Sequence, residues 1–346
     1  MKRKSFYLFA AIATTFCLSS CSNDESSEKM ESPAELKIVA TMAPSLEVST
    51  RASYNLQGTA LNNPTNVGVY VWYETYKDKK TSAPVYNGFE NVKIASYTGS
   101  GPYTLAPSKV LAFPTDNHDV DVYLYAPYKA SPTQTNMCME HTVALDQSLT
   151  AGYEDSDFLY GKATASYSTT KTASVNMYHA MSKIIFKVVN SGVDPSLMTD
   201  ITLKNVLTTT TINMPVAITS PLTCGSGSTT YNVDVASNKN NIKVWGTSGT
   251  GAVSASDAVT NGVAVIVPPQ TTGADAELSV SVNDESTTLS ATAAFSSITL
   301  GPGKVYTYNL NLKGTGVIVS LVSITDWDDS DSPTGTAADL DFDTWS

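Results

Sequence analysis

The sequence predicts an all-β protein. Its 346 residues carry many runs in which apolar and polar side chains alternate, and Val, Ile, Thr and Tyr dominate these runs, as they do in half-buried strands. Turn sequences rich in Gly, Asn and Pro separate the runs, and no stretch keeps a convincing amphipathic helical period over several turns. Short strands spaced in this way are typical of antiparallel β-sandwiches, and their number indicates two such domains in tandem.

The N-terminal residues have the features of an export signal. Lys2–Lys4 supplies a positive start, and the apolar stretch Phe6–Phe16 is too short to span a membrane comfortably. Residues 1–20 are therefore expected to be a signal peptide. The end of this segment, Leu18–Cys21, resembles the bacterial lipobox, which implies cleavage before Cys21 and attachment of a diacylglycerol to its thiol. The alternative is a soluble secreted protein with a chance cysteine.

Residues 21–51 are interpreted as a lipidated acidic tether followed by a removable strand. The acidic run that starts at Ser22–Glu25 is too polar to pack and is expected to be solvated. One face of the extended segment Glu35–Met42 is apolar, and its members are Leu36, Ile38, Ala40 and Met42. Burial of the three larger side chains is worth at most about 1.5–3 kcal/mol each. We therefore expect this strand to fill a groove in the first domain.

Arg51 is the only arginine of the chain apart from Arg3. It lies between the lipoprotein-like leader and the β-patterned body, so a protease that recognises arginine would cut here once, between Arg51 and Ala52. Such a cut would separate both the lipid and the preceding strand from the body. The alternative is that arginine is scarce in an acidic, lysine-using chain and that one falls in a linker by chance.

The body is expected to form an N-terminal domain over residues 52–170 and a C-terminal domain over residues 171–327. The division is placed in the Ser/Thr/Lys-rich passage 166–174. The patterns leave room for short helices in the connections 146–152 and 195–199. The clearest strand patterns are Val67–Tyr76, Val120–Ala126, Lys183–Val189, Asp200–Val206, Val263–Val267, Glu277–Val282, Lys304–Leu312 and Val317–Ile324.

Residues 328–346 are interpreted as an acidic hinge and a candidate donor strand. Asp328–Pro333 is the hinge, and the residues after Ala337 again alternate between apolar and acidic side chains. The apolar face consists of Ala338, Leu340 and Phe342. This pattern mirrors that of the removable strand, and such a segment can pair along an open sheet edge of another chain. The alternative is a disordered acidic tail.

Composition excludes several functions. The net charge of −11 argues against nucleic acid as a partner. The chain has three histidines and no familiar catalytic motif, so we expect no enzymatic activity and no cofactor. Cys138 and His141 could supply two zinc ligands but have no second pair, and His179 is expected to be a packed or hydrogen-bonded core residue. After Cys21 is lipidated, Cys138 and Cys224 remain, and their pairing is left open.

Two further clusters have structural explanations that we prefer. The aspartates 326, 328, 329 and 331 offer carboxylates for calcium but lack the glycine and distal glutamate of an EF-hand loop, so a solvated hinge is expected. The aromatic residues Tyr70, Trp72, Tyr73 and Tyr76 could stack on sugars. Three of these, Tyr70, Trp72 and Tyr76, share a strand parity, which usually means burial. We therefore expect neither a metal site nor a sugar site.

Four motifs occur in an order that resembles a known family. They are His179–Phe186 (HAMSKIIF), Val265–Gln270 (VIVPPQ), Leu300–Tyr308 (LGPGKVYTY) and Ile324–Trp327 (ITDW). Together with the leader, they resemble the fimbrillins of Bacteroidales, the subunits of type V pili. The resemblance implies two transthyretin-like β-sandwich domains, lipoprotein export, cleavage after an arginine at the position of Arg51, and polymerisation by strand exchange.

The expected function is therefore that of a structural pilin, with a shaft role favoured and a tip or accessory adhesin role open. Its partners would be other copies of itself, related fimbrial subunits, an arginine-specific protease and a host or bacterial surface receptor. Before processing, the lipid would hold it in the outer membrane, and after processing it would lie in the fimbrium at the cell surface. The alternative is a surface lipoprotein that binds glycan or protein and never polymerises, with Arg51 uncut.

Overall fold

A computed structural model describes residues 34–42, 65–73, 89–100, 102–114, 117–131, 134–135, 138–190, 193–213, 239–247, 262–284, 287–314, 316–327 and 339–340. These residues all belong to one compact unit, residues 33–346. Within them the regular structure is mostly β-strand, and the helical segments are α1 (Thr150–Asp155) and the 3₁₀ helix η3 (Pro195–Leu197). The predicted all-β class is confirmed, and the two helical segments lie in or beside the connections that left room for them.

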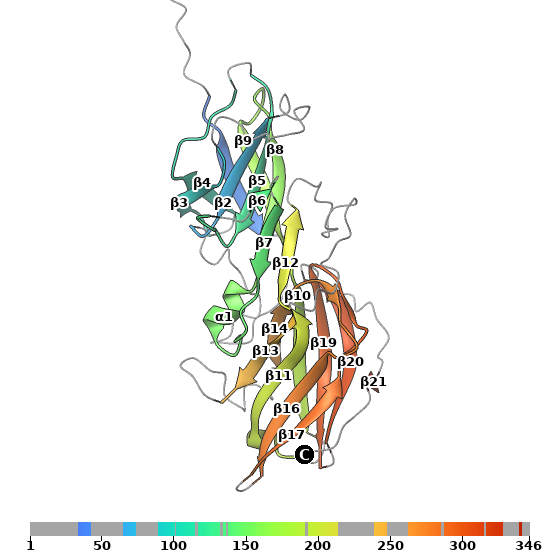
Figure 1. The fold of residues 1–346 in the computed structure, drawn as a ribbon. Helices are drawn as coiled ribbons and strands as arrows, with labels where there is room; N and C mark the ends of the chain where they lie inside the picture. The colour runs from blue at the N-terminus through green and yellow to red at the C-terminus, as the bar shows by residue number, and fades with distance from the viewer. Residues whose placement is uncertain are drawn as a thin grey trace, which may run out of the picture. The chain divides into compact units, whose positions relative to one another are not determined.

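Seven strands close into a barrel in the order β1-β4-β3-β2-β5-β8-β9 (Figure 1). Their bounds are β1 (Lys37–Met42), β2 (Gly68–Tyr73), β3 (Val92–Thr98), β4 (Tyr103–Pro107), β5 (Val120–Ala126), β8 (Leu159–Ala165) and β9 (Thr172–His179). Alternate side chains of these strands form one hydrophobic core, to which Val69, Val122 and Leu124 contribute. The first domain was expected to be a β-sandwich. It closes instead, because β1 pairs with both β4 and β9.

Two contacts between neighbouring barrel strands are short. The register between β2 and β3 covers Gly68↔Lys93 and Val69↔Val92, and that between β8 and β9 covers Leu159↔His179 and Tyr160↔Tyr178. By contrast, β5 pairs with β8 over seven residue pairs, from Val120↔Ala165 to Ala126↔Leu159. The three strands β2, β5 and β8 are therefore joined by long ladders, and short ladders connect them to β3 on one side and to β9 on the other.

The C-terminal part of the described chain contains two larger sheets. One has the order β14-β10-β19-β20-β21 and the other β13-β11-β16-β17 (Figure 1). Buried side chains of both sheets, such as Phe186, Leu203 and Leu310, belong to one hydrophobic core, as expected of a sandwich. The bounds are β10 (Ser182–Asn190), β11 (Met198–Leu207), β13 (Lys239–Gly246), β14 (Val263–Val267), β16 (Glu277–Asp284), β17 (Thr287–Ala294), β19 (Lys304–Lys313), β20 (Gly316–Asp326) and β21 (Asp339–Leu340).

Two small sheets complete the β structure. The first contains β6 (Gln134–Thr135), β7 (Cys138–Thr142) and β12 (Thr209–Asn213), and the second pairs β15 (Gln270–Thr271) with β18 (Thr299–Leu300). The expected division at residues 170 and 171 falls just before β9, yet β9 pairs with β1 and β8 of the barrel. The change from barrel to sandwich strands thus lies between the end of β9 and the start of β10.

A glycine allows β9 to cross close to β8. A Cβ atom on Gly161 would lie 2.2 Å from the carbonyl oxygen of Asn176, well inside van der Waals contact. A side chain at this position would therefore push β9 away from β8. Since β9 is also the partner of β1, the close crossing helps to set the position of the strand against which β1 docks.

The aromatic residues near the start of the body are packed. Tyr70 on β2 is fully buried and lies in the core cluster that also contains Tyr125 and Phe158, while Trp72 is half-buried against that cluster. The ring centroids of Tyr70 and Tyr125 are 6.0 Å apart. Burial of Tyr70 leaves it unable to stack on a sugar. Tyr73 lies in β2 without a described side chain, and Tyr76 lies outside the described residues.

In the part of the chain that the structure describes, no helix has the length and apolar character needed to cross a membrane.

Candidate functional site

The N-terminal strand β1 lies between two strands that are distant in sequence. It pairs antiparallel with β4 through Ile38↔Leu105, and parallel with β9 along its whole length, from Lys37↔Thr172 to Met42↔Met177. Backbone hydrogen bonds extend the docking beyond the strand, since the Leu36 amide donates to the Leu111 carbonyl at 2.9 Å. The strand is thus held by backbone pairing along both of its edges.

The apolar face of β1 points into the barrel core. Leu36 is 3% exposed, and Ile38 and Ala40 are fully buried. All three belong to the same core cluster as Leu105 and Val175. The opposite face is open, because Lys37 is exposed and Val39 is only half-buried. Met42 lies at the end of the strand, and its side chain lies outside the described residues.

Loss of β1 would open the barrel at one place. Leu36 and Ile38 together bury apolar surface worth at most about 3–6 kcal/mol, and β4 and β9 would each be left with an unpaired edge. An unpaired strand edge presents free N–H and C=O groups that can pair with another strand. Removal of β1 would therefore leave a groove between β4 and β9, with core side chains at its floor.

The residues predicted for export and cleavage are not placed by the structure. Cys21, Arg51 and Ala52 lie outside the described residues, as does the signal peptide at residues 1–20. Lipidation and cleavage therefore remain predictions from the sequence.

The candidate donor tail is described over two residues. Asp339 and Leu340 form β21, which pairs antiparallel with β20 through Val319↔Leu340 and Ser320↔Asp339. These two residues thus lie at the outer edge of the five-stranded sheet. The side chain of Leu340, and all of Ala338 and Phe342, lie outside the described residues.

A buried polar cluster joins two of the four motifs that resemble the family, His179–Phe186 and Ile324–Trp327. His179 is hydrogen-bonded through Nδ1 to Oδ2 of Asp157 at 2.8 Å, and its ring stacks on the Trp327 indole with centroids 3.9 Å apart. The Lys183 ammonium lies 5.3 Å from the centroid of the Trp327 ring. Burial raises the pKa of Asp157, although His179 and Lys183 oppose that rise. His179 is therefore a packed, hydrogen-bonded core residue, as predicted.

Backbone contacts around Gly303 join these two motifs to a third, Leu300–Tyr308. The Trp327 amide donates to the Gly303 carbonyl at 2.7 Å, and the Gly303 amide donates to the Met181 carbonyl at 2.8 Å. Gly303 has a φ of +60°, a conformation that favours glycine. The Gly-Pro-Gly turn thus brings the start of β10, the start of β19 and the end of β20 together.

Sequence reasoning missed two buried glutamines that replace strand pairing. The Gln270 side chain accepts from the Leu207 amide at 2.9 Å and donates to the Leu207 carbonyl at 3.0 Å. Gln147 does the same for the amide and carbonyl of Ile266, both at 2.8 Å. In this way Gln147 satisfies backbone groups of β14, the edge strand of its sheet. Gln270 is the last residue of the motif Val265–Gln270, whereas Gln147 stands in a mixed polar and apolar stretch that gave no signal.

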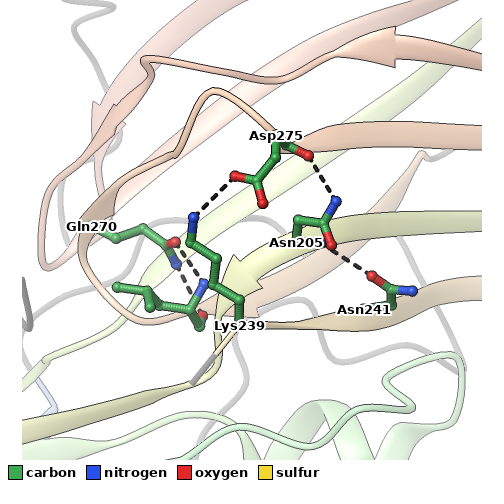
Figure 2. Close-up of polar contacts among 6 residues, drawn as sticks. Asn205, Lys239, Asn241, Gln270 and Asp275 are labelled. Atoms are coloured by element: carbon green, nitrogen blue, oxygen red, sulfur yellow. Dashed lines mark hydrogen bonds and ion pairs between the residues drawn. The ribbon is translucent and has the colours of Figure 1, made fainter. Parts of the chain in front are cut away.

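Figure 2 shows Gln270 beside a second group of polar contacts. Lys239 donates to Oδ1 of Asp275 at 2.9 Å, and the Asn205 side chain donates to the carbonyl of Asp275 at 2.8 Å. Asn205 has a φ of +57° and lies in the irregular part of the β11–β13 register. This group of contacts holds the bulge in β11 against neighbouring segments.

The predicted absence of a metal site concerns residues that are only partly described. His141 is 2% exposed and donates from Nε2 to the Ser156 carbonyl at 2.9 Å. Burial lowers the pKa of His141 to about 4, so the ring is neutral. Among the described residues, no group of three or more His, Cys, Asp and Glu side chains could hold a metal ion. The Cys138 and Asp326 side chains, and the aspartates at 328, 329 and 331, lie outside that set.

Comparison with known families identifies the chain. The described strands form a β-barrel, which includes the N-terminal strand, and a β-sandwich. The model of the fimbrillin-like family matches residues 50–327. The chain belongs to the fimbrillin-like family, whose members are non-enzymatic structural proteins, and this membership implies a fimbrial location at the cell surface. None of the curated proteins matches the chain at a significant level.

Solved structures share the fold. A candidate cell adhesion protein from Bacteroides uniformis has 19% sequence identity and a TM-score of 0.56, and the match covers 85% of this chain and 99% of that one. A candidate cell adhesion protein from Bacteroides ovatus has 18% identity and a TM-score of 0.56, with 87% and 100% covered. At these identities the likeness establishes the fold.

Proposed function

We propose that the chain is a structural pilin of a type V fimbria, most simply a shaft subunit. It is exported to the outer membrane as a lipoprotein on Cys21 and is cut after Arg51. The tail of one subunit, with Ala338, Leu340 and Phe342, then replaces β1 in the next subunit. The barrel and the sandwich are the tandem transthyretin-like domains that the family resemblance implies.

One observation carries the proposal: β1 is built into the barrel core, yet a single cut at Arg51 would detach it from the body. Its ladders to β4 and β9 make it part of the fold, and Ile38 is fully buried. No other arginine lies beyond it in the chain. Strand exchange requires both properties, because the strand must complete the fold before the cut and be replaceable after it.

The proposal is tested on material sheared from cells. Mass spectrometry should find a mature N-terminus at Ala52, and gels run without boiling should show a ladder of multimers that collapses on heating. Arg51→Ala should leave an anchored precursor that does not assemble. Arg51→Lys is the matched control for the protease, because it blocks an arginine-specific enzyme and is still cut by a trypsin-like one.

The tail is tested separately. Leu340→Asp with Phe342→Asp should permit processing but abolish the ladder, because a charge in a buried pocket is strongly unfavourable. Asp341→Asn with Asp343→Asn changes the opposite face and should leave assembly intact. An intact lipidated monomer as the only species would favour a non-polymerising surface lipoprotein that binds glycan or protein. Normal assembly of the Leu340 and Phe342 variant would remove the tail from the proposal.

A further inference from the structure

The buried side chains of β1 differ in size along the strand, so the spaces that they fill in the groove differ in the same way. Leu36 and Ile38 are large, whereas Ala40 is small, and all three are buried. Ala40 lies in register between Tyr103 on β4 and Val175 on β9, both larger than itself. Since protein cores are close-packed, a larger side chain in the place of Ala40 would force its neighbours apart. The position of Ala40 therefore acts as a size filter for any strand that takes the place of β1.

The apolar face of the tail is graded in the opposite direction. Read from N to C, β1 presents large, large, small, whereas Ala338, Leu340 and Phe342 present small, large, large. Two alignments place both Leu340 and Phe342 in the two large positions. In the reversed direction Ala338 takes the place of Ala40. In the same direction as β1, Thr344 takes that place.

The two alignments differ in what they bury. In the reversed direction an alanine replaces an alanine, and every described pocket receives an apolar side chain. In the same direction a threonine enters a position that is fully buried in β1. A buried hydroxyl without a partner is unfavourable, and the added atoms overpack the site. The floor of the groove thus favours the reversed strand.

The open face of the groove accepts the aspartates of the tail. In the reversed alignment Asp339 takes the place of Val39, whose register partners are Thr104 and Ser174. Both of these side chains are exposed. Their hydroxyl groups can donate to a carboxylate, which strengthens a hydrogen bond relative to a neutral acceptor.

We infer that the incoming tail runs antiparallel to the β1 strand that it replaces, with Phe342, Leu340 and Ala338 in the places of Leu36, Ile38 and Ala40. The donor strand is then antiparallel to β9 and parallel to β4, the reverse of β1. This inference rests on the proposed strand exchange and gives the polymer a defined polarity. The Ala40 position selects that polarity by size.

Intersubunit disulfides report the direction. In the reversed alignment residue 339 lies beside Ser174, whereas in the same-direction alignment residue 343 does. Ser174→Cys is therefore combined with Asp339→Cys in one variant and with Asp343→Cys in its matched control. Cys138→Ser and Cys224→Ser remove the native thiols, and the cut after Arg51 removes Cys21.

Both variants are cleaved with an arginine-specific protease, allowed to assemble and oxidised, and then boiled without reductant. The Asp339→Cys variant should give about tenfold more covalent multimer than the Asp343→Cys variant, since a disulfide needs Cα atoms within about 7 Å of each other. The opposite ratio, or equal yields, would overturn the antiparallel direction. Failure of the wild-type body to form multimers at all would instead count against strand exchange itself.

A pair of size variants tests the filter without cysteines. Ala338→Leu should slow multimer formation at least about tenfold, because it overfills the place of Ala40, while Thr344→Leu lies beyond the described pockets and should assemble at the wild-type rate. Slow assembly of Thr344→Leu with normal assembly of Ala338→Leu would assign the same direction as β1. Equal effects of the two variants would show that the Ala40 position does not select by size.

Discussion

Replacement of Ile38 by alanine tests how firmly the removable strand is held. Ile38 is fully buried, with Leu105 on β4 and Ala173 on β9 as its register partners. Truncation of a buried isoleucine to alanine typically costs about 2–5 kcal/mol. Because Ile38 lies on the strand that we propose is removed, this loss weakens the docking of β1 directly. Each 2 kcal/mol corresponds to an increase of roughly 30-fold in the dissociation constant of the cut strand.

The measurement follows the strand after the cut. Purified precursor is cleaved at Arg51 with an arginine-specific protease, and mass spectrometry of the material that stays with the body gives the rate at which the peptide leaves. Ile38→Ala should release it faster than the wild type and form multimers sooner. Val39→Ala is the matched control, because Val39 is the next residue of the strand and only half-buried on the open face.

The two variants separate burial from backbone pairing. Val39→Ala keeps the same ladders to β4 and β9 and should change the release rate by far less than Ile38→Ala. Equal release rates for the two variants would refute the reasoning that the buried face holds the strand. If Ile38→Ala proves too unstable to purify, Ile38→Val gives the same direction with a typical cost of about 0.5–1.5 kcal/mol.

Three further outcomes are expected. Burial lowers the pKa of His141 from its ordinary 6.5 to about 4. The free energy of unfolding should therefore be highest above pH 6.5 and fall by at most about 3 kcal/mol as the pH drops toward 4. His141→Gln should flatten this part of the plot of unfolding free energy against pH. Gln270→Leu should lower the free energy of unfolding by about 2–4 kcal/mol in urea titrations, because it leaves the Leu207 amide and carbonyl without partners. Gly161→Ala should lower the melting temperature, because its Cβ would meet the Asn176 carbonyl at 2.2 Å and overpacking typically costs about 1–3 kcal/mol.

Local alternation predicted the strands and the buried face of β1. The expected strands Val120–Ala126 and Val263–Val267 match β5 and β14 at both ends. The apolar parity of Leu36, Ile38 and Ala40 also pointed to the face that is buried. These features depend on side-chain order within one short segment, which a sequence displays directly.

Strand partners could not be read in the same way. The parallel pairing of Lys37–Met42 with Thr172–Met177 joins segments far apart in the chain, and alternation gives no information about which edge meets which. For the same reason the division was placed before β9, because a Ser/Thr-rich passage marks a connection but not the sheet of the strand that follows. The closure of the barrel is therefore a tertiary property.

The motifs that resemble the family contribute to packing of the core, and they lie outside the segments proposed to exchange. His179, Lys183, Gly303 and Trp327 meet in one buried cluster, where stacking and hydrogen bonds require particular side chains. The β1 strand and the tail contain none of these motifs. For strand exchange, β1 and the tail need only an alternating apolar face and side chains of suitable size, because the backbone supplies the pairing. In the proposed exchange, the order of small and large residues therefore selects one donor direction over the other, and Ala40 is the position with the least room for a larger side chain.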